Sequence, residues 1–410
     1  MTGIKRDALS AISRLLKQFP VVAVIGARQV GKTTLLKQLM PRAPFFDLEK
    51  RADYELIRRD PDFFLSQQNV PIVIDEAQAL PDLFPALRVA VDARRDRPGR
   101  FLISGSSSPE LLKHIHESLA GRIAVYELGG LTVAESWHTA ISPLYGYIAG
   151  GDSSKLLRMQ PSFTAAQLME SCVFGGYPEP FIKYRRKPEQ FDLWMDNYFA
   201  SYVQRDIRNL FPGINADAFQ RFIAMLATSS GNQLNFSDFA RSLEISSPTV
   251  KKYFEIAHGT FVWRMMPSYE KNAAASIVKM PRGYMRDSGL LNHIIGIHTV
   301  QQLQAHHQLG RIWEGFVIEQ LLKGFTQLLL PVKPYYYRTK NAAEIDLIFE
   351  CAAGVIPVEV KLGATIPSRG LTSMKDFIEQ HKCPCGIVIN NADRAAMIAP
   401  KIIQIPAGCL

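Results

Sequence analysis

A glycine-rich run near the start of the chain has the residue types and the spacing that bind phosphate. Residues 26–33 read Gly-Ala-Arg-Gln-Val-Gly-Lys-Thr, so that Lys32 and Thr33 follow the second glycine. Glycines let backbone N–H groups converge on an anion, the lysine places a charge at the β- and γ-phosphates, and the threonine hydroxyl ligates Mg²⁺. We therefore predict a site for ATP and Mg²⁺. Its nucleotide-binding residues are Gly26, Ala27, Arg28, Gln29, Val30, Gly31, Lys32, Thr33 and Thr34.

The flanking segments must position this loop. Residues 21–25 are an apolar run between a proline and a glycine, which is typical of a buried parallel strand. After the loop, leucines at positions 35, 36 and 39 recur at helical spacing. A strand, a glycine loop and a helix in this order indicate a P-loop, and the helix N-terminus adds the positive end of its dipole.

A second apolar strand ends in two carboxylates. Residues 72–76 read Ile-Val-Ile-Asp-Glu. We expect Asp75 to hold Mg²⁺ through water and Glu76 to polarise the water that attacks the γ-phosphate.

A third strand, predicted at residues 101–106, carries two hydroxyl groups at its end. Ser104 and Ser106 would sense the γ-phosphate, or either would cap the turn that follows.

Acidic residues recur late in the chain with strand alternation. In the segment that begins at residue 344, Glu344 and Asp346 fall on one face, and Glu359 and Lys361 share a face of the next predicted strand. A helix precedes these strands, and a helix and a further strand follow them. The order is helix, three strands, helix and strand.

This arrangement predicts a metal-dependent phosphodiester chemistry. Asp346 and Glu359 would bind Mg²⁺, Glu314 or Glu319 of the preceding helix would complete or orient the site, and Lys361 would position or activate water. Two other interpretations stay open: the fold serves as an inactive binding module, or the acidic residues simply solvate the outer face of a hairpin.

The middle of the chain is predicted to be helical over residues 150–230. Residues 235–284 then read as two short helices followed by two strands, which is the layout of a winged helix. Lys251 and Lys252 would approach a DNA groove and Lys271 would contact the DNA backbone from the wing. The alternative is a winged helix that serves packing or protein contact.

An ordered set of motifs resembles a known family. "GARQVGKTTLL", "IVIDEAQ", "FLISGSSSPELL", "SLAGRIAVYEL", "GGYPEP", "YVQRDIRNLF" and "YMRDSGLLNHIIGI" together resemble the bacterial and archaeal AAA-type ATPases fused to a C-terminal domain of unknown function. The C-terminal segment itself resembles the restriction-endonuclease-like fold, in its Holliday-junction-resolvase branch, because Glu359-x-Lys361 follows Asp346 after a helix glutamate.

The resemblance implies an α/β multidomain chain with an AAA-type P-loop parallel sheet. It also implies a homo-oligomer, with a ring as one arrangement, in which an arginine of a neighbouring subunit completes the ATP site. Arg122 stands where such an arginine normally lies. A competing cluster comprises Arg94, Arg95, Arg97 and Arg100.

These segments divide the chain into four expected domains. They are an AAA-type P-loop ATPase domain at residues 1–145, a helical lid or linker region at 146–230, a winged-helix domain at 231–286, and a restriction-endonuclease-like domain at 287–410.

The composition limits which partners and which cellular location the protein can have. The 410 residues are 47% hydrophobic and carry a formal net charge of +9, with a basic segment at residues 181–290, so an anionic partner such as DNA is permitted. No apolar run is long enough to cross a membrane and no signal-peptide pattern opens the chain, so we expect a cytoplasmic protein. The five cysteines lack zinc-site spacing and are expected to be reduced.

The sequence thus predicts an ATP-hydrolysing protein that moves or remodels duplex or branched DNA. Two other functions remain open. One is a nucleotide-gated regulatory switch that binds a protein partner, and the other is an ATP-regulated DNA endonuclease.

Overall fold

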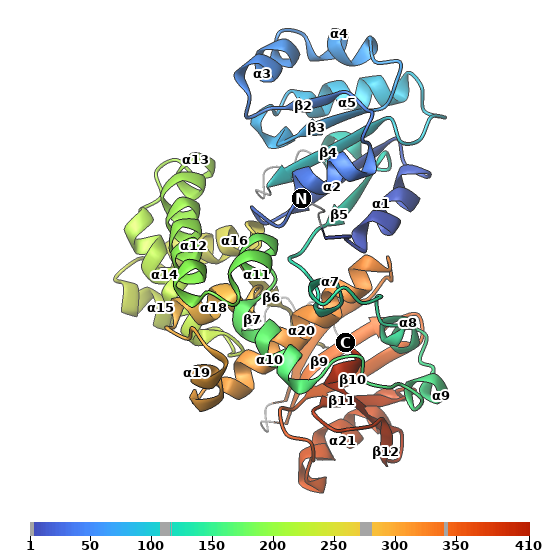
Figure 1. The fold of residues 1–410 in the computed structure, drawn as a ribbon, viewed down its shortest axis with the longest axis vertical. Coiled ribbons are helices and arrows are strands. Elements are labelled where there is room, and N and C mark those ends of the chain that lie inside the picture. The colour runs from blue at the N-terminus through green and yellow to red at the C-terminus, as the bar shows by residue number, and fades with distance from the viewer. Residues whose placement is uncertain (1–3, 107–114, 116, 271–280, 340–342) are drawn as a thin grey trace. The chain divides into compact units, whose positions relative to one another are not determined.

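The computed structural model describes the chain apart from residues 1–3, 107–114, 116, 271–280 and 340–342. The described residues form two compact units. The first comprises residues 1–130 and 255–262, and the second comprises residues 131–254 and 263–410. Figure 1 shows the strands of the first unit in blue to teal and the large sheet of the second unit in orange to red.

The first unit is built on a parallel sheet of five strands in the order β2-β3-β4-β1-β5. Because all five strands run the same way, their carboxyl ends meet at one edge of the sheet. The strands are β1 (Val21–Gly26), β2 (Phe45–Asp47), β3 (Ile72–Asp75), β4 (Phe101–Ser106) and β5 (Ile123–Glu127). The α/β fold with a parallel sheet that the sequence predicted is confirmed.

Helices cover this sheet and bury its apolar strands. Every residue of β1, β3 and β4 is buried, as expected for central parallel strands covered on both faces. Leu83, Phe84 and Leu87 of α5 join the same apolar core as Ile72 and Ile74 of β3. The helices of this unit are α1 (Ala8–Leu16), α2 (Lys32–Leu39), α3 (Arg51–Arg58), α4 (Pro61–Ser66), the 3₁₀ turn η1 (Ala77–Ala79) and α5 (Leu83–Asp92).

The second unit opens with helices. They are α7 (Val133–Ser136), α8 (Leu144–Ala149), α9 (Ser153–Leu156), α10 (Ala165–Phe174), α11 (Pro178–Tyr184), α12 (Pro188–Ser201), the π-helix η2 (Tyr202–Ile207), α13 (Arg208–Leu210) and α14 (Ala216–Ser229).

Two further helices and a two-stranded hairpin follow. They are α15 (Phe236–Leu243), α16 (Ser247–Gly259), β6 (Trp263–Met266) and β7 (Arg282–Met285). Aromatic rings join the three helices, because Phe254 of α16 makes edge contacts with Phe222 of α14 and Phe239 of α15 at ring-centroid distances of 4.9 and 5.1 Å. This stack buries one face of α16 and leaves Lys251 and Lys252 exposed.

The remainder of the second unit is a six-stranded mixed sheet in the order β12-β13-β11-β10-β9-β8. Its strands are β8 (Lys333–Arg338), β9 (Glu344–Cys351), β10 (Gly354–Val360), β11 (Gly386–Asn390), β12 (Ala396–Ala399) and β13 (Ile402–Pro406). Its helices are α18 (Ser288–Ile294), α19 (Val300–Ala305), α20 (Leu309–Gln327), η3 (Ser368–Leu371), α21 (Thr372–His381) and η4 (Ala407–Cys409). From α20 to β11 the elements follow the order helix, three strands, helix and strand.

A pair of glycines explains the Gly-Gly motif between α10 and α11. Gly175 has φ 68°, and a Cβ there would lie 2.3 Å from Asp287 Oδ1. Asp287 accepts a hydrogen bond from the Gly176 N–H at 2.7 Å and caps α18 through the Leu290 N–H at 2.9 Å. One carboxylate therefore joins the start of α18 to the α10–α11 turn, and glycine makes the close approach possible.

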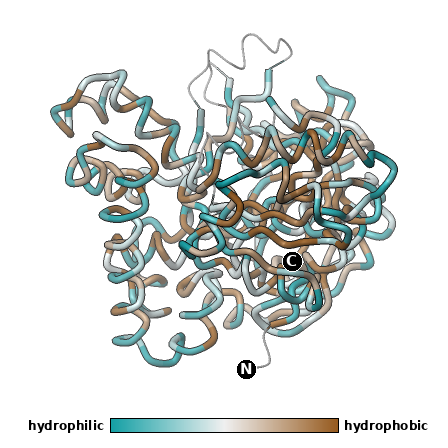
Figure 2. Tube along the Cα trace, turned by 90° about the horizontal axis from the view of Figure 1, so that it is seen from above, coloured by the Kyte–Doolittle hydropathy of each residue, from teal (hydrophilic) through white to brown (hydrophobic). Residues whose placement is uncertain are grey.

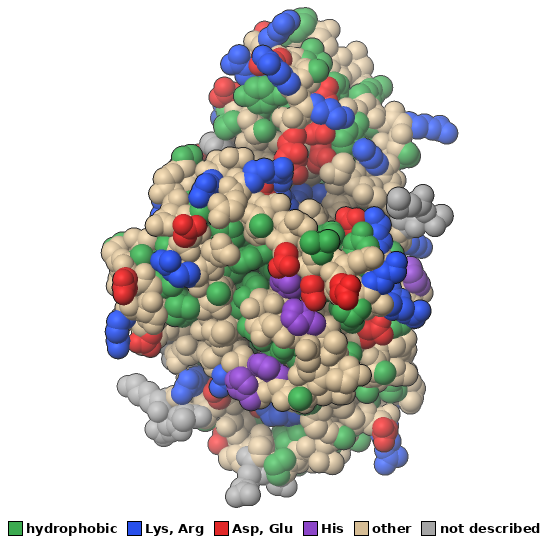
Figure 3. Space-filling model, turned by 60° about the vertical axis from the view of Figure 1, so that its left-hand side comes forward, with side chains coloured by type: hydrophobic (Ala, Val, Ile, Leu, Met, Phe, Trp, Pro, Cys, Tyr) green, Lys and Arg blue, Asp and Glu red, His purple; other side chains and the backbone are tan. Residues whose placement is uncertain are grey.

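Hydropathy and charge follow this architecture. In Figure 2 hydrophobic residues run along the strands and hydrophilic residues gather in turns and on outer helices. Figure 3 shows one face on which basic, acidic and hydrophobic side chains are interspersed, and on which the histidines gather in groups. Among the residues that the structure describes, no helix combines the length and the apolar character that a membrane crossing requires.

Candidate functional site

The phosphate-binding loop lies between β1 and α2, as the sequence predicts. Gly31, with φ 96°, precedes the first residue of α2, and Lys32 is only 5% exposed. The Lys32 ammonium donates to the carbonyls of Gly26 and Ala27 at 3.0 and 2.9 Å, which holds it against the loop. A Cβ at Gly26 would lie 2.3 Å from the Leu128 carbonyl oxygen, so this position requires glycine.

The two carboxylates at the end of β3 occupy different environments. Asp75 is 2% exposed and accepts hydrogen bonds from the hydroxyls of Thr33, at 2.7 Å, and Ser104. Glu76 has φ 56° and accepts from the Ser106 hydroxyl at 2.7 Å. Both serines that the sequence singles out therefore contact the acidic pair, one serine to each carboxylate.

Gln78 is a residue of this site that the sequence analysis missed. Its amide donates to the Glu76 carboxylate and, at 3.1 Å, to Ser106 Oγ. The signal was present in the Asp-Glu-Ala-Gln run, because a residue two positions after Glu76 in a 3₁₀ turn stays close to it.

The pKa shifts of Lys32 and Glu76 fit their expected roles in phosphate binding and water activation. Burial lowers the pKa of Lys32, and the Glu76 and Asp75 carboxylates offset part of that effect. Burial would raise the pKa of Glu76, but the charge of Lys32 and hydrogen bonds from Gln78 and Ser106 hold that pKa below its ordinary value. Glu76 is thus an ionised carboxylate near neutral pH, as a group that polarises water must be.

The donor set suits Mg²⁺ at this site. Thr33 and Asp75 bring a hydroxyl and a carboxylate oxygen to 2.7 Å from each other. These are hard oxygen donors, which magnesium prefers, and they lie at the carboxyl edge of the sheet beside the P-loop. Bound there, Mg²⁺ would neutralise charge on the β- and γ-phosphate oxygens.

The arginines near the site differ in their partners. Arg122, the expected trans-acting arginine, forms an ion pair with Asp92 of its own chain at 2.7 and 2.9 Å. Of the competing cluster, Arg94 donates to Asn69 and Arg100 donates to the Ala90 carbonyl. Arg28 of the P-loop pairs with an exposed carboxylate of the same unit.

Arg6 was not anticipated from the sequence. Its guanidinium is 6% exposed and donates to the carbonyl of Val30 at 2.7 Å and to that of Gly129 at 2.8 Å. The Arg6 side chain therefore links the P-loop to the segment that precedes α1 through hydrogen bonds.

The predicted acidic residues of the second unit do meet. Asp346 of β9 and Glu359 of β10 lie on neighbouring strands, and Lys361 Nζ lies 3.4 Å from Asp346 and 2.6 Å from Glu359. Glu314 of α20 reaches the same centre, as Tyr284 donates to its carboxylate at 2.6 Å. Asp346 and Glu314 are only 5% and 8% exposed, so the interpretation in which these acids solvate an outer face is wrong.

An arginine of β7 occupies the middle of this acidic centre. The Arg282 guanidinium lies 3.0 Å from Glu314, 2.7 Å from Glu344 and 3.7 Å from Asp346. It also donates through Nε to the Gly231 carbonyl at 2.7 Å. The sequence analysis did not include Arg282, although Arg282 and Tyr284 share one face of a predicted strand.

A divalent metal does not fit this arrangement. The carboxylates of Glu314 and Asp346 are paired with Arg282, and that of Glu359 is paired with Lys361. A metal would need the same oxygens and would bring a second positive charge against a buried guanidinium. We therefore derive no metal-dependent step at this centre.

Burial shapes the protonation of this centre. Burial and the nearby Asp346 charge raise the pKa of Glu314 to about 8, with Arg282 offsetting part of the effect. Burial and Asp346 likewise raise the pKa of Glu359 to about 7 against the influence of Lys361. The acidic neighbours outweigh the effect of burial on Arg282 and hold its pKa above its usual value.

These shifts predict how the stability of the second unit depends on pH. The folded-state pKa of Glu314 lies above the ordinary value of 4.5, so the folded state binds this proton more tightly than the unfolded state. The stabilisation from that proton is complete below about pH 4.5 and is lost as pH rises toward about 8. The free energy of unfolding, relative to Glu314→Gln, should fall across this window by up to about 1.4 kcal/mol per pKa unit.

Tryptophan fluorescence during urea unfolding measures this effect, because residues 137, 194, 263 and 313, the four tryptophans, all lie in the second unit. Glu379→Gln, at an exposed position on α21, is the control and should leave the pH profile parallel to the wild type. A constant difference between wild type and Glu314→Gln from pH 4.5 to 8 would contradict the shift.

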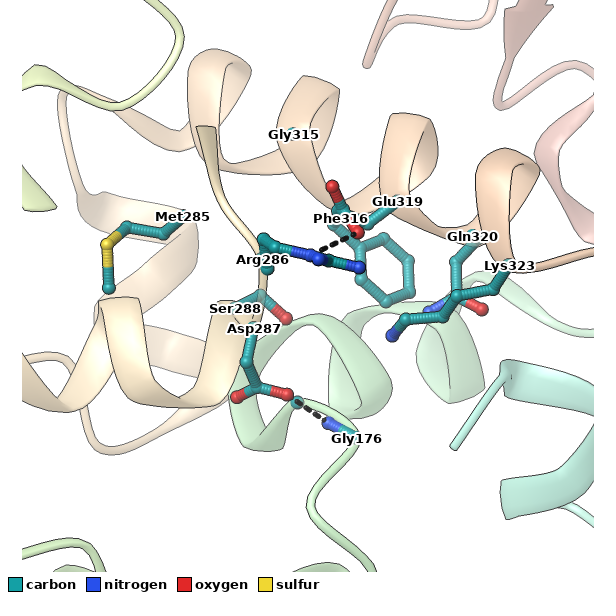
Figure 4. Close-up of a pocket in the computed structure, with 11 residues that line it drawn as sticks. Gly176, Met285, Arg286, Asp287, Ser288, Gly315, Phe316, Glu319, Gln320 and Lys323 are labelled. Atoms are coloured by element: carbon teal, nitrogen blue, oxygen red, sulfur yellow. Dashed lines mark hydrogen bonds and ion pairs between the residues drawn. The ribbon is translucent and has the colours of Figure 1, made fainter. Parts of the chain in front are cut away.

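Glu319, the alternative to Glu314, lies in a different environment. Its carboxylate pairs with Arg264 of β6 and lies 3.8 Å from Arg286. Figure 4 shows a small pocket where Arg286 points to Glu319, Asp287 points to the Gly176 amide, and Lys323 extends from α20. The pocket encloses about 10 Å³, roughly the space of one water molecule. Glu314, and not Glu319, therefore belongs to the Asp346 centre.

The residues predicted to contact DNA are placed in part. Lys251 and Lys252 are exposed on α16, whereas Lys271 lies outside the described residues. The hairpin of β6 and β7 follows α16, as the winged-helix prediction requires of its strands.

Three family models match successive parts of the chain. Residues 18–137 match an AAA domain, residues 165–301 match a domain of unknown function (DUF8612), and residues 309–410 match another domain of unknown function (DUF4143). The AAA match spans the P-loop, Asp75, Glu76 and both serines.

Two mycobacterial proteins are similar over nearly the whole chain. They are the uncharacterized protein Rv2008c of Mycobacterium tuberculosis and the uncharacterized protein Mb2031c of Mycobacterium bovis. Each is 35% identical over 405 residues, which cover 98% of this chain and 83% of the relative.

Solved structures also show similarity at low sequence identity. The Walker-type ATPase paby2304 of Pyrococcus abyssi is 14% identical, with 71% of this chain and 95% of that chain covered and a TM-score of 0.44. The RuvB Holliday junction branch migration motor of Thermotoga maritima is 15% identical, with 64% and 90% covered and a TM-score of 0.31.

Proposed function

This chain belongs to the same family as the two mycobacterial proteins, and we propose that it hydrolyses ATP and uses the energy to move or remodel DNA. Its N-terminal unit is an AAA-type P-loop ATPase unit. The observation that carries the proposal is the convergence of Lys32, the Thr33–Asp75 pair and the Ser106–Glu76 pair at one edge of the parallel sheet.

The residues of this edge divide the work of ATP hydrolysis. The loop amides and Lys32 bind the β- and γ-phosphates, and the Lys32 ammonium exchanges its carbonyl partners for phosphate oxygens. Glu76 accepts a proton from, or polarises, the water that attacks the γ-phosphate. Ser106 and Gln78 orient the Glu76 carboxylate, since both donate hydrogen bonds to it.

We also propose that the active form is a homo-oligomer, with a ring as one arrangement. An arginine of a neighbouring subunit would stabilise charge on the γ-phosphate. Arg122 suits this role because its side chain lies at the surface, although it must first leave Asp92. Sedimentation with and without ATP tests the assembly, and a monomer under both conditions would contradict it.

DNA is proposed as the substrate on grounds of charge and surface. The chain has a net charge of +9, and Lys251 and Lys252 are exposed on α16. In this proposal the rest of the chain keeps its predicted division into a helical part (146–230), a winged helix (231–286) and a restriction-endonuclease-like part (287–410). Because Arg282 and Lys361 already pair with the carboxyl groups of the acidic centre, the last part is given no cleavage step.

DNA should stimulate ATP turnover. We expect duplex or branched DNA to raise kcat several-fold at low salt, with the effect declining as salt rises because phosphate contacts release counterions. Lys251→Ala/Lys252→Ala should reduce the stimulation and leave turnover without DNA unchanged. Steady-state phosphate release with duplex, junction and single-stranded DNA provides the measurement.

A matched double variant controls for lost charge. Arg58→Ala/Arg59→Ala removes two adjacent exposed cations from the end of α3 and should keep the stimulation. Turnover that no nucleic acid changes would contradict the DNA proposal and favour a nucleotide-gated switch that binds a protein partner.

A further inference from the structure

Two histidines and two aspartates from separate helices meet in the second unit. Asp192 and Asp196 lie one turn apart on α12, His293 lies in the last turn of α18, and His298 stands just before α19. One donor atom from each of Asp192, His293 and His298 lies within 4.8 Å of the others. On the face that Figure 3 displays, histidine side chains stand beside acidic ones.

The backbone fixes where both histidines lie. Gly296, with φ 78°, ends α18, and its N–H donates to the His293 carbonyl at 3.1 Å. This turn leads the chain back beside α18, so that His298 comes next to His293. The His298 N–H then donates to Gln302 Oε1 at 2.7 Å, within the capping box that starts α19. Local hydrogen bonds that do not involve the rings therefore fix the backbone that carries the two histidines.

One aspartate oxygen faces both imidazoles. Asp192 Oδ1 lies 2.8 Å from His298 Nδ1 and 3.5 Å from His293 Nδ1. On its other side, His293 Nε2 lies 3.0 Å from Asp196 Oδ1. The His293 side chain is 10% exposed, and its Nδ1 is buried without a hydrogen bond to any residue that the structure describes.

One tautomer of His293 fits the hydrogen bond to Asp196 and leaves Nδ1 as an acceptor. In that tautomer Nε2 carries the proton and donates it to Asp196. In the neutral imidazole the buried Nδ1 then presents a lone pair toward the Asp192 carboxylate. Two electron-rich atoms that face each other repel, unless a cation lies between them. A doubly protonated His293 would instead direct an N–H at Asp192 across the 3.5 Å that separates the two atoms, as an ion pair.

We propose that Asp192, His293 and His298 bind Zn²⁺ and that Asp196 orients the His293 ring. Imidazole and carboxylate donors suit zinc, and ligands about 2.0–2.1 Å from a tetrahedral ion lie about 3.3 Å from one another. The present separations need only small side-chain movements to reach that value. A histidine that donates its second N–H to a carboxylate is the usual outer-shell arrangement of a zinc ligand. The ion would join α12 to the segment between α18 and α19.

Zinc titration of the full chain, stripped with a chelator, tests this site. Isothermal calorimetry should show a Zn²⁺ equivalent whose affinity falls at least about 100-fold in Asp192→Asn and His298→Ala, and about 10- to 100-fold in Asp196→Asn. Co²⁺ at the same equivalent should give the visible absorption of a four-coordinate ion. His306→Ala and His307→Ala, which alter adjacent histidines outside the cluster, should bind as the wild type does.

Thermal unfolding without metal checks that each variant folds, and Zn²⁺ should raise the Tm of the wild type more than that of Asp192→Asn. The proposal is overturned if the wild type binds no Zn²⁺, or if folded Asp192→Asn and His298→Ala retain every equivalent at wild-type affinity.

Discussion

Lys32→Ala should lower kcat/KM for ATP at least about 100-fold, because it removes a buried charge that the transferred phosphoryl group needs. Lys32 is 5% exposed, and its ammonium is held by loop carbonyls at the end of β1. The variant should still fold, since Asp75 and Glu76 keep the hydrogen bonds that they accept from neighbouring hydroxyl and amide groups. Phosphate release under steady-state conditions, with circular dichroism as a folding check, measures the effect.

A second lysine of the same helix provides the matched control. Lys37 is exposed on α2 and contacts the ring of Phe45, 5.0 Å from its centroid. Lys37→Ala should change turnover less than about two-fold, as expected of a surface position. If folded Lys32→Ala turned over ATP at the wild-type rate, the assignment of the P-loop as the catalytic phosphate site would be wrong.

Arg282→Ala should destabilise the second unit by about 3–5 kcal/mol, because it leaves buried carboxylates without their counter-charge. The guanidinium pairs with Glu314, Glu344 and Asp346, and among the described residues Lys361 is the cation that would remain at the centre. Urea unfolding followed by tryptophan fluorescence reports this loss, since the tryptophans lie in that unit alone.

A double variant separates lost charge balance from lost packing. Arg282→Ala/Glu314→Gln removes the arginine together with one of the buried acidic groups that it contacts, so it should be more stable than Arg282→Ala alone. Arg394→Ala, at an exposed position, should change the free energy of unfolding by less than about 0.5 kcal/mol. A loss below about 1 kcal/mol in Arg282→Ala would show that Arg282 does not balance the centre.

Charge balance also bears on what the second unit can do. Asp346, Glu359 and Lys361 have the residue types and the proximity that the sequence predicted for a metal-dependent nuclease. Arg282 adds what the sequence pattern did not show, a resident cation among the oxygens that a metal would need. The same residues are thus accounted for by an ion-paired centre without a metal.

The sequence by itself determined the ATP site, since that chemistry is local. Residues 26–33 supply the loop, and the apolar runs on both sides dictate a strand and a helix whose ends meet at it. Asp75 and Glu76 follow a buried strand, and parallel strands place their carboxyl ends at one edge. Their proximity to Thr33 and Ser106 was therefore predictable. The ion pair between Arg122 and Asp92 was not, because it joins side chains at the surface and strand order does not fix such a contact.

Only the tertiary structure decided what surrounds the other charged residues. Arg282 lies 32 positions before Glu314 and 64 before Asp346, and nothing in strand alternation states which face of β7 meets α20. Asp192 and His293 are likewise brought together by the packing of α12 on α18, 101 positions apart. Periodicity reports which residues share a face of one element. It carries no information on which faces pack together, because that is settled by burial and charge pairing across the whole unit.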